Sequence, residues 1–246
     1  MIVITGASGK TGSKVAELLL EKKMRVRVLG RSHDHLKSLG EKGAEIMTGD
    51  QADPAFLANA FRGAEAAYLQ VPSVPGPHVS INYYNTMGNV AISAIKKAKI
   101  RKVVFLSSFE LQIGSWIGPV HGLHVVERKL DVLKKVDIMV LRAGILMENL
   151  LKYIPLMKNS KPSGNESIQI ITAREIGEKV ANLLENPVFK GHSVLELSGQ
   201  KWFFYPRLSL NVNRVSGLPP DEAAMGASSW RNADESQSNT FRLVNA

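Results

Sequence analysis

Residues 1–12 read Met-Ile-Val-Ile-Thr-Gly-Ala-Ser-Gly-Lys-Thr-Gly, and their three glycines are the strongest indication of the fold. The apolar run before Gly6 predicts a buried strand, and the apolar periodicity after Gly12 predicts an amphipathic helix. In such a unit Gly6 permits a tight turn, Gly9 lets the backbone approach a pyrophosphate, and Gly12 lets helix and strand pack closely. The stretch therefore predicts a Rossmann-type dinucleotide site.

The other positions of this loop also suit an anionic ligand. Free amides at the start of the helix would face phosphate oxygens, while Ser8 and Thr11 offer hydroxyl donors and Lys10 offers a positive charge. The triplet 9–11 does not indicate a nucleotide triphosphatase, because that motif needs a glycine where Ile4 stands. We expect pyrophosphate contacts from Gly6, Ser8, Gly9, Lys10, Thr11 and Gly12.

Short apolar runs alternate with amphipathic stretches along most of the chain, as in a parallel sheet covered by helices on both faces. The fold class that follows is α/β, a Rossmann-type doubly wound parallel sheet with a small C-terminal region on the substrate side. The expected strands are Ile2–Thr5, Val26–Leu29, Glu45–Thr48, Ala66–Gln70, Val103–Ser107, Ile138–Leu141 and Val194–Leu197.

The end of the second strand indicates which dinucleotide is bound. A carboxylate there would bind the ribose hydroxyls of NAD and repel a 2′-phosphate, but this strand is followed by Arg31 and Ser32. A guanidinium and a hydroxyl favour NADP(H) over NAD(H), with Lys10 expected close enough to help. The alternative is an arginine that merely faces solvent. Asp50, after the third strand, is a candidate for the adenine amine or for a turn cap.

Composition excludes several other classes of function. The chain has no cysteine, which excludes disulfides, thiolate metal sites and a cysteine nucleophile. No apolar run approaches the length of a membrane helix and no leader is visible, so we expect a cytoplasmic protein without a membrane partner. The 31 basic and 22 acidic residues give a net charge of +9. We assign the basic run 96–102 to a helix end rather than to nucleic acid, because no aromatic residues are interleaved.

With these residues identified, residues 1–199 resemble the NmrA-like branch of the atypical short-chain dehydrogenases, which includes quinone and triphenylmethane-dye reductases. Besides the glycine loop and Arg31, the resemblance rests on Gly49-Asp50 and on Leu106-Ser107-Ser108. It continues through segments 141–150 and 171–177.

The resemblance implies where the two ligands lie. The cofactor would cross the carboxyl ends of the strands, so that Gln70, Val71, Pro72 and Ser107 border the nicotinamide ribose. The acceptor pocket would be lined by Ser108, Phe109, His121 and Asn149, with His124 as a further candidate. For the histidines, an ordinary position on a helix surface or in a loop is the alternative interpretation.

Departures from the pattern affect the mechanism more than the matches do. Counting back from Glu127, Pro119 and Leu123 stand where ordinary short-chain dehydrogenases have tyrosine and lysine, and neither can transfer a proton. Quinone or dye reduction needs no such pair, because the electron-poor acceptor can take its proton from water. We therefore expect an NADPH-dependent reductase of quinone-like or dye-like acceptors, with no catalytic residue assigned and no metal.

A second hypothesis is a non-catalytic NADP(H) sensor that acts through a protein partner, which the missing pair and a short tail would favour. The expected organisation is a cofactor-binding core over residues 1–150 and a smaller substrate-side region over 151–246, with 200–246 irregular because prolines and polar residues accumulate there.

Overall fold

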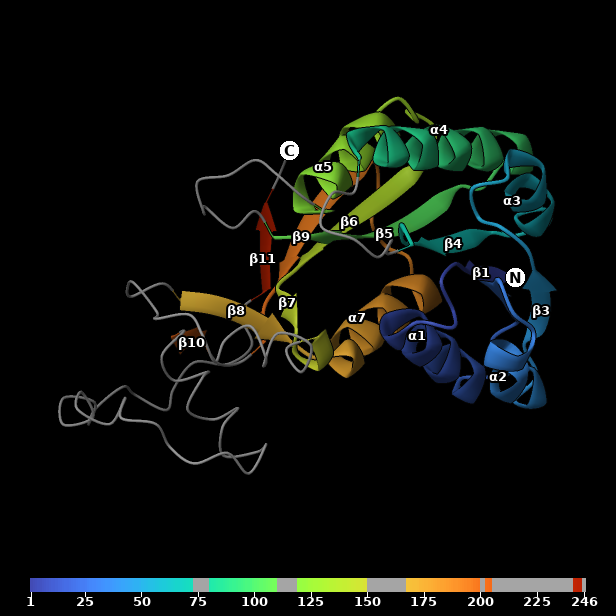
Figure 1. Ribbon diagram of the computed structural model, residues 1–246, viewed down its shortest axis with the longest axis horizontal. Helices are drawn as coiled ribbons and strands as arrows, with labels where there is room; N and C mark the ends of the chain where they lie inside the picture. Colours follow the sequence, from blue (N-terminus) through green and yellow to red (C-terminus); the bar gives the residue numbers. More distant parts are fainter. Residues whose placement is uncertain (73–79, 110–118, 150–166, 200–201, 205–240, 245–246) are drawn as a thin grey trace.

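The computed structural model describes residues 1–72, 80–109, 119–149, 167–199, 202–204 and 241–244 (Figure 1). Its main sheet has eight strands in the order β11-β9-β6-β5-β4-β1-β2-β3. All neighbours in this sheet pair in parallel except β11, which runs antiparallel to β9. The strands are β1 Ile2–Ile4, β2 Val26–Gly30, β3 Glu45–Thr48, β4 Ala66–Leu69, β5 Lys102–Ser108, β6 Asp137–Ala143, β9 His192–Leu197 and β11 Phe241–Val244. The predicted Rossmann-type sheet is confirmed, with all seven expected strands present.

Helices cover both faces of this sheet. They are α1 Lys10–Glu21, α2 Lys37–Glu41, α3 Pro54–Ala60, α4 Ile81–Ala98, α5 Pro119–Leu130 and α7 Ala173–Glu185, with a 3-10 turn at Asp34–Leu36. Figure 1 shows α3, α4 and α5 on one face and α1, α2 and α7 on the other. Two helices begin with a side-chain cap: Asp53 caps α3 by accepting the amide of Ala55 at 2.8 Å, and a capping box of Thr172 and Glu175 begins α7.

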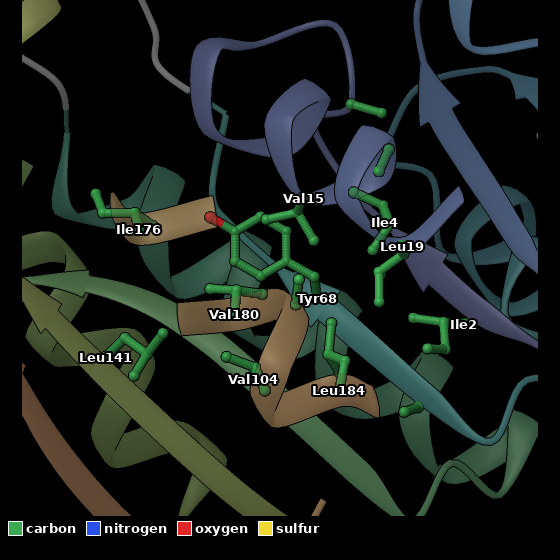
Figure 2. Packing of buried hydrophobic residues seen from close by; sticks show 14 of the residues in the cluster. Ile2, Ile4, Val15, Leu19, Tyr68, Val104, Leu141, Ile176, Val180 and Leu184 are labelled. Atoms are coloured by element: carbon green, nitrogen blue, oxygen red, sulfur yellow. The ribbon is translucent and has the colours of Figure 1, made fainter. Parts of the chain in front are cut away.

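The core lies in two layers, one on each side of the sheet. Along β4, Ala66 and Tyr68 pack into the layer beneath α1 and α7, whereas Ala67 and Leu69 pack into the layer beneath α3, α4 and α5. All four side chains are buried, which explains why this strand reads as a continuous apolar run. Figure 2 shows the Tyr68 ring among aliphatic side chains of the first layer.

A smaller sheet lies beyond the carboxyl end of β6, in the order β10-β8-β7. Its strands are β7 Ile145–Leu146, β8 Ser167–Ile171 and β10 Trp202–Phe204. The chain then returns from β8 to the main sheet through α7 and β9. The boundary expected near Leu150 lies outside the described residues, and the segments after it belong partly to the core and partly to the small sheet.

The segment 200–246 differs from the irregular structure expected for it, because β10 and β11 lie within it. Both are short strands that pair antiparallel with an existing sheet edge, so they carry little sequence signal of their own. The rest of that segment lies outside the described residues. Among the described helices, none is long and apolar enough to cross a membrane.

Candidate functional site

The glycine loop between β1 and α1 has the geometry of a phosphate cradle. Gly6 adopts φ +59°, a left-handed conformation that side chains rarely take, and its carbonyl accepts the Gly9 amide at 2.9 Å. A Cβ on Gly12 would lie 2.4 Å from the Gly6 carbonyl oxygen, so helix and turn are in contact. Gly9 caps α1 without a side-chain hydrogen bond. The first-turn amides of α1 therefore have no competing side-chain cap and can bind an anion.

A set of neutral hydrogen bonds, here called the loop brace, holds this cradle to the end of β4. The Gln70 side chain donates to the Gly6 carbonyl at 3.1 Å and accepts from the Thr11 hydroxyl at 2.9 Å. The Tyr68 hydroxyl donates to Thr11 at 3.2 Å from the core, and burial raises the pKa of Tyr68, which keeps this donor protonated. The Thr5 hydroxyl completes the loop brace by accepting a hydrogen bond from the backbone amide of Gln70 at 2.9 Å.

The loop brace changes the roles expected for two residues. Thr11 is buried and its hydroxyl is used by Gln70 and Tyr68, so it supports the loop from within rather than offering a free donor. The Gln70 side chain lies against Gly6 itself, since a Cβ there would be 1.8 Å from its amide nitrogen. Ser8 is exposed beside the loop, as expected of a hydroxyl that could meet a ligand.

Lys10 extends from the loop toward the segment after β7. Its ammonium group donates to the Glu148 carbonyl oxygen and to Asn149 Oδ1, the latter at 3.0 Å. These partners lie on the β6 side of the loop, whereas the sequence suggested that Lys10 would assist Arg31 at the end of β2. Lys10 thus connects the phosphate cradle to the asparagine expected in the acceptor pocket. Glu148 in turn caps α7 by accepting the Ala173 amide at 2.9 Å.

The opposite end of the predicted cofactor site lies where β2 and β3 end. Arg31 is exposed and Ser32 is half-buried beside it. Asp50 accepts the Ala52 amide at 2.9 Å, which is the turn cap that the sequence allowed; its adenine role stays a prediction. Burial raises the pKa of Tyr83 on α4, with smaller contributions from Tyr84 and Asp50 that raise it and from Arg31 that lowers it. Arg31 and Asp50 are therefore within electrostatic reach of Tyr83.

A cluster of buried and half-buried polar side chains lies at the carboxyl ends of β5 and β6; we call it the Glu127 cluster, and it comprises Ser107, His124, Glu127 and Arg142. The Ser107 hydroxyl donates to Glu127 Oε1, and Arg142 donates to Glu127 Oε2 from both Nε, at 3.2 Å, and Nη2, at 2.7 Å. His124 Nε2 lies 3.1 Å from the Ser108 carbonyl oxygen and 3.8 Å from Glu127 Oε1. The cluster ties α5 to both strands.

The Glu127 cluster bears on several predicted pocket residues. Ser107 is buried, and its hydroxyl is used internally rather than exposed at a ribose. His124 is 7% exposed, so the helix-surface reading of this histidine is wrong. Ser108 and Phe109 follow at the end of β5, half-buried, with the Phe109 amide bonded to the Ala143 carbonyl at 2.9 Å. His121 lies on α5, one turn before His124, and is half-buried.

The positions that would hold a proton-transfer pair have other uses. Pro119 begins α5, where proline is favoured because its missing N–H would be unsatisfied in any case. Leu123 packs against the core layer beneath α4 and α5. The structure therefore places no acid or base at either position. Residues 110–118 and 150–166, which adjoin this region, lie outside the described part of the chain.

Several site residues had no sequence signal. Gln51 donates to the Gln70 carbonyl at 2.8 Å, and Tyr83 donates to the Pro72 carbonyl at 2.8 Å. Together they fix the backbone of Gln70, Val71 and Pro72 at the end of β4, where the sequence predicted the cofactor site. Only the fold brings Gln51, Tyr83 and this segment together, because each comes from a different element. Among the described residues no group of His, Asp or Glu could hold a metal ion.

Comparisons with known proteins agree with this geometry. A family model described as the NmrA-like family matches residues 1–202. An NAD(P)H azoreductase of Xenophilus azovorans is 26% identical over 198 residues, covering 76% of this chain and 64% of the azoreductase. The uncharacterized protein y4nL of Sinorhizobium fredii is 31% identical over 123 residues, covering 44% of this chain and 34% of the length of y4nL. The chain thus spans less than two thirds of both curated relatives.

Solved structures show the same fold at low sequence identity. A triphenylmethane reductase of Citrobacter sp. superposes with a TM-score of 0.71 at 18% identity, covering 88% of this chain and 76% of the other. An NADPH-dependent quinone oxidoreductase from Escherichia coli, complexed with NADPH, gives a TM-score of 0.71 at 24% identity, covering 89% and 76%. At these identities the likeness supports the fold and leaves substrate open.

Proposed function

The chain belongs to the NmrA-like family, and from that premise we propose that it is an NADPH-dependent reductase of quinone-like or dye-like acceptors. The observation that carries the proposal is the phosphate cradle. Gly6 and Gly12 leave no room for side chains, α1 begins without a side-chain cap, and the loop brace fixes the turn. These residues fit a dinucleotide pyrophosphate, because backbone amides and a helix N-terminus meet at one place.

The preference for NADPH rests on the end of β2. Arg31 is exposed there and can pair with a 2′-phosphate through two N–H groups. Asp50 is held in its own turn and comes from β3, so no carboxylate occupies the position after β2 that would favour NAD. Lys10 lies at the other end of the cradle, where its described partners are neutral oxygen atoms, so its charge favours a phosphate-containing ligand in general and not NADPH over NADH.

The proposed reaction needs little acid–base catalysis from the residues of this chain. When bound, reduced nicotinamide supplies a hydride, and the acceptor takes the matching proton from water. The residues of the chain bind the pyrophosphate, orient the two reactants and hold Asn149 near Lys10 at 3.0 Å. The Glu127 cluster keeps the ends of β5 and β6 in place, and its charges are paired with each other.

A titration followed by a turnover assay tests the proposal. NADPH and NADH are titrated by fluorescence, and menadione is then added to the same sample. We expect tighter binding of NADPH and its rapid oxidation. Oxidation no faster than in buffer, across a panel of quinones, azo compounds and dyes, would contradict the reductase.

The basis of cofactor preference is tested with one pair of variants. Arg31→Ala should weaken NADPH binding about tenfold while NADH binding stays unchanged, because a charged hydrogen bond to phosphate is lost. Arg25→Ala is the control, since Arg25 is exposed at the opposite end of the same strand. Equal losses for NADPH and NADH in Arg31→Ala would contradict a 2′-phosphate contact.

The same measurements test a second candidate, a cofactor-dependent sensor that acts on a protein partner. It is favoured by one observation: the partly buried Leu123 packs against the core at the position where a proton-transfer residue would stand. Tight NADPH binding without turnover of any acceptor would support the sensor over the reductase, provided that a partner binds with cofactor-dependent affinity.

A further inference from the structure

A basic hollow lies at the edge of the sheet opposite the phosphate cradle. Its lining comes from the end of α4 and from the turn between α5 and β6, just before β5 and β6 begin. It measures about 590 Å³ and is open to solvent. Its floor is apolar and buried, formed by Ile95, Ile100, Leu133 and Val136, and Val132 at its border is 56% exposed.

Five cations surround this floor, and all of them are exposed: Lys96, Lys99, Arg101, Lys134 and Lys135. The lining contains no carboxylate. Within the part of the chain that the structure describes, none of the five side chains forms an ion pair. The hollow therefore presents a concentrated positive surface, which an anionic ligand would complement.

Structural roles explain only part of this charge. Lys96 lies in the last turn of α4, where a cation favours the helix dipole. Lys102, the neighbour of Arg101, is fully used: it donates to the Pro187 carbonyl at 2.7 Å and pairs with Asp137 at 3.4 Å. Arg101, Lys134 and Lys135 have no comparable role. They come from separate parts of the chain and converge on the hollow only in the folded protein.

The backbone at Lys99 is in a conformation that is uncommon for a lysine. This residue follows α4 in the left-handed conformation with φ +57°, where glycine is favoured and a side chain costs conformational energy. Lys23, which follows α1, shares the conformation with φ +59° but is not part of the lining. Because Lys23 has the same conformation away from the hollow, the conformation does not by itself indicate a ligand, and the two lysines form a matched pair for mutagenesis.

We propose that the basic hollow binds an acidic peptide segment of a partner protein, with one apolar side chain of that segment on the floor. The ring of unpaired cations supplies the complement to carboxylates, and the apolar floor supplies a place for an anchor residue. The lining has no aromatic side chain on which bases could stack, which disfavours single-stranded nucleic acid. The inference is independent of hydride transfer.

Fluorescence anisotropy with a labelled, glutamate-rich peptide that carries one central leucine tests this proposal. We expect saturable binding that weakens as salt is raised. Replacing the leucine with serine should weaken binding several-fold, because burial of the leucine side chain is lost. Lys134→Glu combined with Lys135→Glu should weaken it at least about tenfold through charge reversal. NADPH binding by that variant should be unchanged, since the cradle lies at the opposite edge.

Two matched variants separate ligand binding from stability. Lys99→Gly and Lys23→Gly should both raise the Tm, because each relieves a left-handed lysine. Only Lys99→Gly should weaken peptide binding. Equal peptide affinity in the wild type, in Lys99→Gly and in the charge-reversal variant would overturn the proposal. Binding of oligothymidylate or of phosphatidylserine vesicles in place of the peptide would overturn it as well.

Discussion

The two halves of the carboxyl edge of the sheet are built from different interactions. At β1 and β4 the loop brace consists of hydrogen bonds between neutral groups, and the nearby cations Lys10 and Arg31 are exposed and have no carboxylate partner among the described residues. At β5 and β6 the Glu127 cluster pairs the buried Glu127 carboxylate with the half-buried Arg142 guanidinium. The first half is thus prepared for an external anion, whereas the second half is electrostatically complete.

This difference teaches how the fold can keep a cofactor site while the usual proton-transfer pair is absent. A cradle for phosphate depends on backbone geometry and on charges left without a counterion. The second half needs only rigidity if the acceptor takes its proton from water. Substitutions in the first half should therefore affect cofactor binding, and substitutions in the second half should affect stability.

The largest effect is expected in the Glu127 cluster. Glu127→Ala removes the buried partner of Ser107 and Arg142 and should lower the free energy of unfolding by about 3 kcal/mol, as measured by urea denaturation. Glu178→Ala is the matched control, because Glu178 pairs with Arg174 on the surface of α7 and should cost less than about 0.5 kcal/mol. Similar losses for the two variants would show that burial of the cluster contributes little.

The next effect is expected at the cradle. Gly12→Ala places a Cβ 2.4 Å from a backbone oxygen and should abolish NADPH binding while lowering stability by about 2 kcal/mol. Gly43→Ala is its control, because Gly43 has φ +99° but nothing within 4 Å. It should cost about 1 kcal/mol from backbone strain and leave NADPH binding intact. Normal binding by Gly12→Ala would mean that the helix does not need this close contact.

A smaller effect is expected within the loop brace. Thr11→Val removes a buried hydroxyl from Gln70 and Tyr68 and should cost about 1 to 2 kcal/mol, with weaker NADPH binding because the loop loses support. Thr11→Ser keeps the hydroxyl and should retain most of the affinity. Calorimetric titration with NADPH measures both. If valine and serine behave alike, the hydroxyl does not support the loop.

The smallest effect is expected at the amino edge, far from both halves. The Gly191 amide bonded to Asp137, together with Lys102, lowers the pKa of that carboxyl from its ordinary value of 3.8. A lowered pKa stabilises the fold when the pH is above the ordinary pKa of the carboxyl. This stabilisation disappears as the pH falls through the lowered pKa. Asp137→Asn should therefore cost about 0.5 kcal/mol at neutral pH. The difference in unfolding free energy between Asp137→Asn and the wild type should vanish in acid. A difference that stays constant with pH would show that titration of Asp137 is not its cause.

Sequence patterns predicted the sheet because each parallel strand is a continuous apolar run, buried on both faces as β4 is. They also predicted the cradle, since Gly6 and Gly12 are required by local backbone geometry. They did not predict the loop brace or the Glu127 cluster, where partners such as Thr11 and Gln70 are separated by 59 residues. Such contacts depend on side-chain placement in the finished fold, and residue spacing carries no information about them.

The basic residues illustrate the same limit. Lys96, Lys99 and Arg101 stood out in the sequence, but Lys134 and Lys135 joined them only through the fold, which also turned Lys102 to a structural role. A helix-end interpretation is adequate for Lys96 and insufficient for the group as a whole.

The path of the chain between the two sheets has a consequence for engineering. The chain leaves the main sheet after β6, forms β7 and β8, returns through α7 and β9, and then supplies β10 and β11. The small sheet is therefore not formed by one continuous segment of the chain that could be exchanged alone. A chimera with one crossover near residue 150 would exchange α7 and β9 together with the acceptor side, and α7 is the helix whose Gly177 packs against Lys14 of α1. Exchanging the small sheet alone calls for separate exchanges on either side of α7 and β9, which leaves these two elements and their packing on the main sheet intact.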